Sequence, residues 1–220
     1  MHNVQLDRED ILKRQLELAE ANRRLLEGMT VVAISVMGAI GSGKTLLIER
    51  MIDRLAIRGL GVGTIAGDSA GDDDHQRFLA RGAHSVNLNT QDDCHLDART
   101  VAHAMEDLPL EGLDVLFIEN VGNLICPGDF PLGTAKEVVV ISTTEGDDMV
   151  RKHPKIFSQS DILVLNKIDL ADAVDVNPER ILSDYARINP RGKAVLTDAR
   201  HDTGVDDLLE TLGIECTNTQ

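Results

Sequence analysis

The chain of 220 residues is long enough for one domain that buries a single large core. Its 22 basic and 37 acidic residues give a net charge of −15, which argues against DNA, RNA or an anionic membrane as the main partner. With four Phe, one Tyr and no Trp, the chain lacks the aromatic platforms on which single-stranded nucleic acid stacks.

The N-terminus is charged throughout and does not resemble an export signal, and no apolar run is long enough to cross a bilayer. The chain has three cysteines, an odd number, which is typical of free thiols in a reducing compartment. We therefore expect a cytoplasmic protein.

The first predicted element is a charged amphipathic helix over residues 6–27, within an N-terminal unit that spans 1–28. One apolar stripe repeats every seven residues and is formed by Ile11, Leu18 and Leu25 together with Leu12, Ala19 and Leu26. Gly28 ends the helix, as a C-terminal glycine commonly does. The favoured interpretation is a helix docked on its own domain, and the alternative is a dimer contact between two such helices.

Strand and helix patterns then alternate over residues 29–214, and residues 215–220 are expected to be a frayed tail. The expected strands are 31–37, 63–66, 115–119, 137–142, 162–166 and 194–197. The expected helices are 44–57, 74–81, 97–108, 150–158, 178–188 and 205–212. Because the strands are near-continuous apolar runs, the pattern predicts a mostly parallel sheet covered by helices on both faces, with ligands at the carboxyl ends of the strands.

The first strand leads into Gly38-Ala39-Ile40-Gly41-Ser42-Gly43-Lys44-Thr45, which fits the pattern G-x-x-x-x-G-K-[ST] in its strand–loop–helix context. Glycines let the backbone wrap around phosphates, and the helix that follows adds its positive N-terminal dipole. Lys44 is expected to reach the terminal phosphates, and the Thr45 hydroxyl to hold Mg²⁺. The sequence therefore predicts a three-layer α/β P-loop NTPase.

A second motif, Asn166-Lys167-Ile168-Asp169, follows the strand 162–166 and matches the N-K-x-D element of guanine-specific GTPases. A carboxylate at Asp169 can accept hydrogens from guanine N1 and N2, which adenine does not offer, while the Lys167 stem covers the base. Ala199 is expected to offer its backbone N–H to the guanine carbonyl, although its neighbours depart from the usual Ser-Ala-Lys pattern. We interpret the nucleotide as GTP.

Carboxylates at strand ends are the expected Mg²⁺ and water-positioning groups. Asp68 ends the second strand and Glu119 ends the third, and both join Lys44 as candidate catalytic residues. Asp74 belongs to a run of three Asp residues that forms either a solvated helix start or part of this site.

Two cysteines lie in loops that leave the sheet: Cys94, beside His95, and Cys126. Thiolate and imidazole ligands suit Ni²⁺ or Zn²⁺ far better than Mg²⁺, with a fourth ligand from water or a second subunit. The alternative is that the cysteines pack as small hydrophobes, since no C-x-x-C pair is present.

Beyond these motifs, the chain resembles the HypB-type nickel-incorporation GTPases of hydrogenase maturation over residues 31–209. The most specific stretch, residues 119–127, has the sequence ENVGNLICP. Further similar stretches are residues 38–45, 89–98, 142–148, 152–154 and 166–169.

The resemblance implies a GTPase that dimerises when GTP binds, with Cys94, His95 and Cys126 binding Ni²⁺ or Zn²⁺ near the dimer interface. It also implies that Lys152 reaches nucleotide across that interface and that Asp68 and Asp74 lie near Mg²⁺. A second nickel-maturation protein and a hydrogenase large subunit are the implied partners. The N-terminal C-x-x-C-G-C motif and the histidine-rich stretch of some relatives are missing, so the tight and storage nickel sites are expected to be missing too.

Two rival functions remain open. A small-molecule kinase would share the phosphate loop but is disfavoured by the motif that ends in Asp169. The other is a GTP-dependent chaperone for urease or for a cobalamin-dependent mutase. The pairing of Cys94 with His95 disfavours the mutase client, and the stretch that begins at Glu119 is more similar to hydrogenase-related than to urease-related proteins.

Overall fold

The fold is described from a computed structural model for residues 2–68, 71–90 and 95–214, with side chains described from Leu12 onward. Seven strands form one sheet in the order β3-β2-β4-β1-β5-β6-β7, and every neighbouring pair is parallel. The mostly parallel α/β sheet predicted from the sequence is therefore confirmed. The tail predicted at 215–220 lies outside the described residues.

The strands are β1 (Val32–Gly38), β2 (Val62–Asp68), β3 (His84–Asn89), β4 (Val115–Glu119), β5 (Lys136–Ser142), β6 (Ile162–Asn166) and β7 (Lys193–Leu196). The helices are α1 (His2–Gly28), α2 (Lys44–Ile57), α3 (Asp73–Ala80), α4 (Ala98–Glu106), α5 (Met149–Lys152), α6 (Pro154–Gln159), α7 (Pro178–Ile188) and α8 (Val205–Leu212). Short 3₁₀ turns include η2 (Pro127–Asp129), η3 (Thr143–Glu145) and η4 (Ile168–Leu170).

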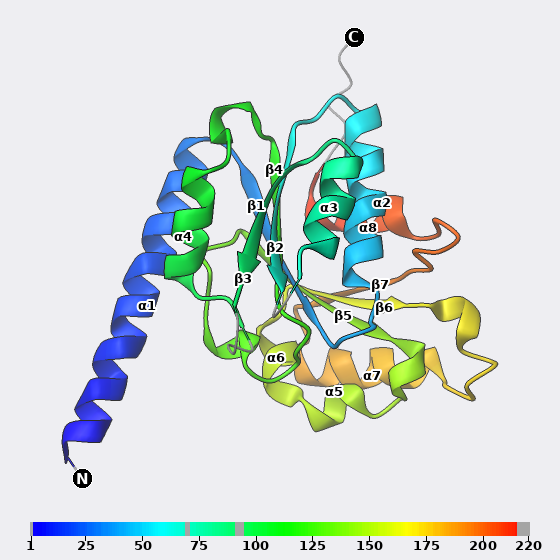
Figure 1. Cartoon of the computed structure of the whole chain (residues 1–220). Coiled ribbons are helices and arrows are strands. Elements are labelled where there is room, and N and C mark those ends of the chain that lie inside the picture. The colour runs from blue at the N-terminus through cyan, green and yellow to red at the C-terminus, as the bar shows by residue number, and fades with distance from the viewer. Residues whose placement is uncertain (1, 69–70, 91–94, 215–220) are drawn as a thin grey trace.

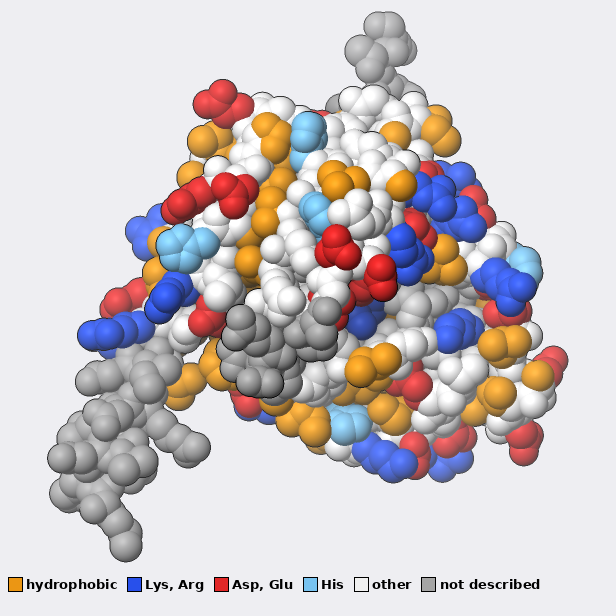
Figure 2. All heavy atoms as spheres, in the orientation of Figure 1, with side chains coloured by type: hydrophobic (Ala, Val, Ile, Leu, Met, Phe, Trp, Pro, Cys, Tyr) orange, Lys and Arg blue, Asp and Glu red, His pale blue; other side chains and the backbone are white. Residues whose placement is uncertain are grey.

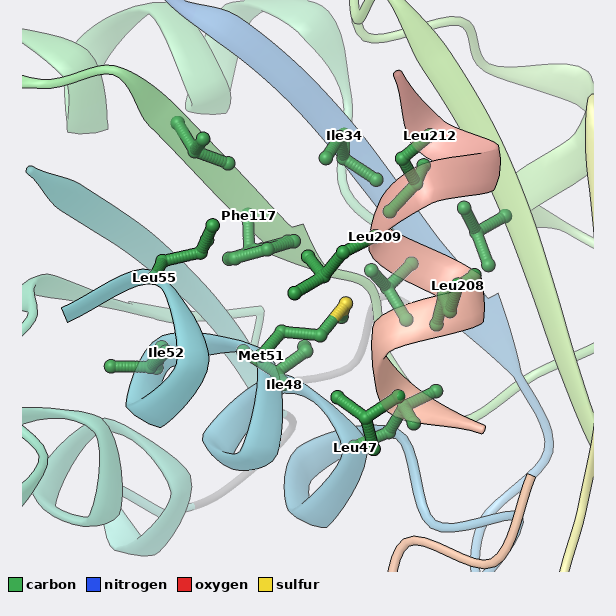
Figure 3. Close-up of a cluster of buried hydrophobic side chains, with 14 of the residues drawn as sticks. Ile34, Leu47, Ile48, Met51, Ile52, Leu55, Phe117, Leu208, Leu209 and Leu212 are labelled. Atoms are coloured by element: carbon green, nitrogen blue, oxygen red, sulfur yellow. The ribbon is translucent and has the colours of Figure 1, made fainter. Parts of the chain in front are cut away.

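The sheet is the middle of three layers (Figure 1). Helices α2, α3 and α8 cover one face, where Leu47 and Met51 of α2 pack with Phe117 and Leu208 in a fully buried cluster (Figure 3). Helices α1 and α4 cover the β2–β4 side of the other face, and α5, α6 and α7 cover its β5–β6 side. Burial on both faces explains why the central strands are continuous apolar runs.

Helix α1 docks on its own domain through its second half. Ala19 and Leu26 are buried, and the buried Asn22 side chain donates to the backbone oxygens of Ala98 (2.8 Å) and Leu132 (3.0 Å). The first turns of α1 extend beyond the body of the molecule (Figure 1). Docking was the favoured interpretation, and a role of the projecting half in dimer formation stays a prediction.

The sequence missed one strand and merged two helices. β3 alternates polar residues with only Val86 and Leu88, and it pairs with β2 alone at the sheet edge, so its burial is only partial. The single helix predicted at 150–158 was wrong, because His153 breaks it between α5 and α6. Pro154 explains the break, since proline disfavours helical backbone in the residue before it and lacks an N–H of its own.

Charged side chains of both signs lie on one face of the molecule. Figure 2 shows Lys and Arg side chains interspersed with Asp and Glu on this face, so the negative charge is not gathered there into one patch. No helix within the described part of the chain combines the length and the hydropathy needed to cross a membrane.

Candidate functional site

The strand register brings the predicted site residues to one edge of the sheet. Glu119 of β4 pairs with Val36 of β1 and with Ala66 of β2, and Ser142 of β5 pairs with Asn166 of β6. Because all of these strands are parallel, the phosphate loop and the polar residues that end β2, β4 and β6 emerge at the same edge.

The phosphate loop connects β1 to α2 and needs glycine at two close approaches. A Cβ on Gly38 would lie 2.1 Å from the Val140 carbonyl oxygen, and a Cβ on Gly43 would lie 2.4 Å from Asn166 Nδ2. Gly43 also has φ of 96° as the N-terminal cap of α2, a left-handed conformation that favours glycine. Ser42 Oγ is fully buried without a hydrogen-bond partner, which fits a loop shaped to receive a ligand.

Two lysines hold the rim of this loop through backbone carbonyls. Lys44 Nζ donates to the Ala39 oxygen at 3.3 Å, and Lys167 Nζ donates to the Gly41 oxygen at 2.7 Å. Lys44 is buried, so its charge acts in a poorly solvated environment where an anionic phosphate would be strongly attracted.

Glu119 is the buried carboxylate of the site. Its Oε1 accepts a hydrogen bond from Thr45 Oγ1 at 2.9 Å and lies 3.9 Å from Lys44 Nζ, while its Oε2 is buried without a partner. Burial raises the pKa of Glu119 to about 7 against the opposing attraction of Lys44. Mg²⁺ prefers oxygen ligands, and the hydroxyl of Thr45 lies beside a carboxylate oxygen of Glu119 that has no hydrogen-bond partner. Thr45 and Glu119 therefore fit the predicted cation.

The other two predicted acids flank Glu119. Asp68 ends β2, the strand next to β4, and its backbone oxygen accepts from Thr90 N at 2.8 Å. Asp74 lies in the first turn of α3, where it is 3.4 Å from Arg77, and its negative charge contributes to the raised pKa of Glu119. Both acids therefore belong to the elements that border β4 and Glu119, and their role at Mg²⁺ stays a prediction.

Asn166 organises the base side. Its Nδ2 donates to the Ser42 backbone oxygen at 3.0 Å, and its Oδ1 accepts from Thr197 Oγ1 and from Ala199 N, both at 3.1 Å. The Ala199 N–H that the sequence assigns to the guanine carbonyl is thus already engaged inside the protein. A guanine oxygen would have to share that donor with Asn166.

Asp169 lies in η4 with its side chain partly exposed, as a base-reading carboxylate requires. The sequence did not single out its neighbours. His201 Nδ1 is 2.5 Å from Asp198 Oδ2 and 4.0 Å from Asp169 Oδ2, and the three side chains are a group of potential metal ligands within the described residues. Only contacts formed by the fold reveal this group, since residues 169 and 198 belong to separate loops.

The predicted nickel or zinc ligands are only partly described. His95 stacks on Phe130 with ring centroids 3.8 Å apart, which joins the His95 loop to the loop of the half-buried, reduced Cys126. Cys94 lies outside the described residues. The structure therefore brings together the two loops that carry the candidate ligands, and the three-ligand site stays a prediction.

Lys152, predicted to act across a dimer interface, lies on the surface at the end of α5. Its Nζ is 2.7 Å from Asp148 Oδ2, and that hydrogen bond lowers the pKa of Asp148. More than half of the Lys152 side chain is exposed, so it is accessible to a partner molecule.

The chain is similar to known proteins of one family. The family model for the nucleotide-binding domain of CobW, HypB and UreG proteins matches residues 32–196. A protein of Methanocaldococcus jannaschii named "Probable hydrogenase maturation factor HypB" is 54% identical over 201 residues, which cover 91% of this chain and 90% of that protein. The chain belongs to the HypB family.

Other HypB proteins are similar to this chain in sequence and in structure. The hydrogenase maturation factor HypB of Rhizobium leguminosarum is 42% identical over 90% of this chain and 66% of its own length. The crystal structure of HypB from Archaeoglobus fulgidus superposes with a TM-score of 0.85 at 43% identity, over 92% of this chain and 98% of that one. HypB from Helicobacter pylori in complex with nickel also gives 0.85, at 27% identity, over 94% and 99%.

A more distant likeness concerns the fold alone. The signal recognition particle receptor FtsY of Elizabethkingia anophelis in complex with GDP superposes with a TM-score of 0.58 at 15% identity, over 88% of this chain and 73% of that one. The predicted P-loop NTPase fold is thus confirmed.

Proposed function

We propose that this protein is a GTP-hydrolysing metallochaperone that binds nickel and delivers it during maturation of a [NiFe]-hydrogenase, forming a homodimer when GTP binds. One observation carries the proposal: β4 ends in Glu119, which contacts Thr45 of the phosphate loop, and the same segment continues to Cys126. The short segment from Glu119 to Cys126 therefore connects the candidate nucleotide site to the candidate metal loop.

The nucleotide is GTP in this proposal. The Asp169 carboxylate would accept hydrogens from guanine N1 and N2, and Lys167, already bonded to Gly41, would lie along the base. Thr45, Asp68 and Asp74 would hold Mg²⁺, directly or through water, which would neutralise charge on the phosphates during hydrolysis. Glu119, with one free buried oxygen and a pKa near 7, is suited to hold or accept a proton from water.

The metal cargo is Ni²⁺, or alternatively Zn²⁺, bound by Cys94, His95 and Cys126. The softness of thiolate and imidazole supports this choice over Mg²⁺, and the HypB structure in complex with nickel supports nickel handling in the family. A second nickel-maturation protein and the hydrogenase large subunit are the proposed partners. A urease-type or cobalamin-mutase client is the alternative.

Exposed apolar side chains beside the phosphate loop support a dimer across the nucleotide. Ile40 at the tip of the loop is 85% exposed, and Ile125, next to Cys126, is 65% exposed. Covering these two side chains with a second subunit would remove apolar surface from water, which favours association. Lys152, exposed on α5, would then reach the nucleotide of the other subunit.

The proposal is tested by titrating the wild type, Asp169→Ala and Cys126→Ala with GTP, ATP, Ni²⁺ and Zn²⁺, and by measuring mass with GDP and with a non-hydrolysable GTP analogue. The wild type should prefer GTP, bind one metal ion per chain and double its mass only with the analogue. Asp169→Ala should lose the preference for GTP over ATP and keep metal binding. Cys126→Ala should lose stoichiometric metal binding and keep GTP binding. Equal competition by ATP in the wild type, or unchanged nickel titration of Cys126→Ala, would refute the corresponding half.

A further inference from the structure

Asn120 lies between the nucleotide site and the candidate metal loop. It follows Glu119 directly, is 1% exposed, and its Oδ1 accepts hydrogen bonds from Leu96 N at 3.1 Å and Val121 N at 3.0 Å. Leu96 follows His95 in the chain. We propose that Asn120 is a positioning residue that couples the nucleotide state to the orientation of His95, an inference that rests on the proposed function.

The segment that holds Asn120 is in contact with the phosphate loop on one side. Glu119 accepts the hydrogen bond of Thr45 Oγ1 at 2.9 Å. Further along, Gly122 lies so close to Ile40 that a Cβ on Gly122 would be 2.3 Å from Ile40 Cγ1 and 3.1 Å from Ile40 N. A rearrangement of the phosphate loop would therefore displace this segment through two contacts, one at Glu119 and one at Gly122.

On the other side, the same segment fixes the backbone beside His95. The Leu96 side chain is 1% exposed and lies over Gly67, where a Cβ would be 2.9 Å from Leu96 Cδ1 and 2.8 Å from the Glu119 backbone oxygen. The His95 ring stacks on Phe130. The Asn120 amide is thus the side-chain acceptor of the backbone N–H that follows the candidate ligand.

The coupling follows from what Thr45 must do. Thr45 Oγ1 now donates to Glu119, but it is also the atom that holds Mg²⁺ when a P-loop binds its nucleotide. Because the hydroxyl coordinates Mg²⁺ through an oxygen lone pair, it still donates its hydrogen to Glu119, and Glu119 therefore follows Thr45 when the phosphate loop closes on its nucleotide. Asn120 lies between Glu119 and Gly122, which packs on Ile40 of the loop, so a movement of the loop that displaces both residues also displaces Asn120 Oδ1. The buried Leu96 N–H follows its acceptor and reorients His95.

Thermodynamic linkage makes the inference measurable. If nucleotide state changes the metal affinity by some factor, the metal changes the nucleotide affinity by the same factor. The quantity to measure is the ratio of the Ni²⁺ Kd with GDP to that with a non-hydrolysable GTP analogue. A chromophoric chelator competes for the metal, and the thiolate-to-nickel charge-transfer band reports that the ligands still bind.

The deciding variant is Asn120→Ala, with Asn123→Ala as the matched control. Asn123 lies in the same loop, but its Oδ1 accepts from Ile125 N at 2.8 Å. Asn120→Ser is the second variant, which keeps a polar group but is too short to reach Leu96 N, and it replaces Asn120→Ala if that variant does not fold. Thermal unfolding of each variant confirms the fold.

We expect a ratio of about 5 or more in the wild type and in Asn123→Ala, within the range usual for coupled sites. In Asn120→Ala the ratio should fall to about 1, with the charge-transfer band kept and GDP affinity within about twofold of the wild type. A wild-type ratio in Asn120→Ala, or a ratio of 1 in the wild type, overturns the inference and leaves the proposed function standing. Absence of Ni²⁺ or GTP binding in the wild type overturns the proposed function itself.

Discussion

Replacing Glu119 by Gln should stabilise the protein above neutral pH in the absence of metal and nucleotide. The side chain is 5% exposed, and its Oε2 has no hydrogen-bond partner. Burial raises its pKa from 4.5 to about 7 despite the attraction of Lys44. Glutamine keeps an oxygen that accepts from Thr45 and removes the buried negative charge.

The size of the effect follows from the pKa. A shift of about 2.5 units at 1.36 kcal/mol per unit corresponds to about 3 kcal/mol. Because the folded-state pKa lies above the unfolded value, this contribution is fully present below about pH 4.5 and is lost as the pH rises through about 7. For a chain of this length, about 3 kcal/mol corresponds to roughly 6–12 °C in Tm.

Urea unfolding of the wild type and Glu119→Gln at pH 5 and pH 8.5, with chelator and without nucleotide, measures this difference. Between the two pH values the wild type should lose about 2–3 kcal/mol more stability than the variant, because the other titrating groups are common to both. Glu27→Gln is the control, since Glu27 is largely exposed and forms only a surface pair with Arg23. It should follow the wild type at both pH values.

Parallel pH dependence of Glu119→Gln and the wild type would contradict the raised pKa of Glu119. A larger loss of stability by the variant at pH 8.5 would contradict it equally, since the attraction between Lys44 and the carboxylate would then outweigh burial. GTP hydrolysis by the variant should fall in either case. A buried carboxylate that destabilises the resting protein is a common feature of functional sites.

Two further predictions concern contacts made by the fold. Gly43→Ala should lower GDP affinity at least tenfold in a fluorescent-nucleotide titration, because the new Cβ would lie 2.4 Å from the Asn166 amide and displace it. Gly59→Ala is the control. Gly59 also has a positive φ, 74°, but a Cβ there would meet no atom within 4 Å, so this variant should leave the affinity unchanged. Equal affinities in both variants would contradict this. Asn22→Leu should lower unfolding free energy by about 2 kcal/mol, since two buried backbone oxygens lose their donor, and a change no larger than that of the exposed control Arg23→Leu would count against it.

Local sequence was sufficient for six of the seven strands of the sheet and for the phosphate loop. The loop from Gly38 to Thr45 follows a strand and begins a helix, and its glycines are required by close contacts that any P-loop shares. The edge strand β3 was missed because one face of an edge strand needs few apolar residues, here Val86 and Leu88. Pro154 is visible in the sequence, but the helical periodicity on both sides of it predicts one continuous helix, whereas the structure has two.

The sequence by itself determined the fold class and the phosphate loop, because each depends on residue types at short, fixed spacings, and by the same kind of spacing it predicts a guanine-binding role for residues 166–169. The tertiary structure alone decided that Thr45 contacts Glu119, that Asn120 holds the backbone beside His95 and that His201 lies beside Asp169. Thr45 and Glu119 are 74 residues apart in the chain, and Leu96 and Asn120 are 24 residues apart, yet each pair forms a direct hydrogen bond. Such pairs meet only when parallel strands place their carboxyl ends at one edge of the sheet, and no local pattern encodes that meeting.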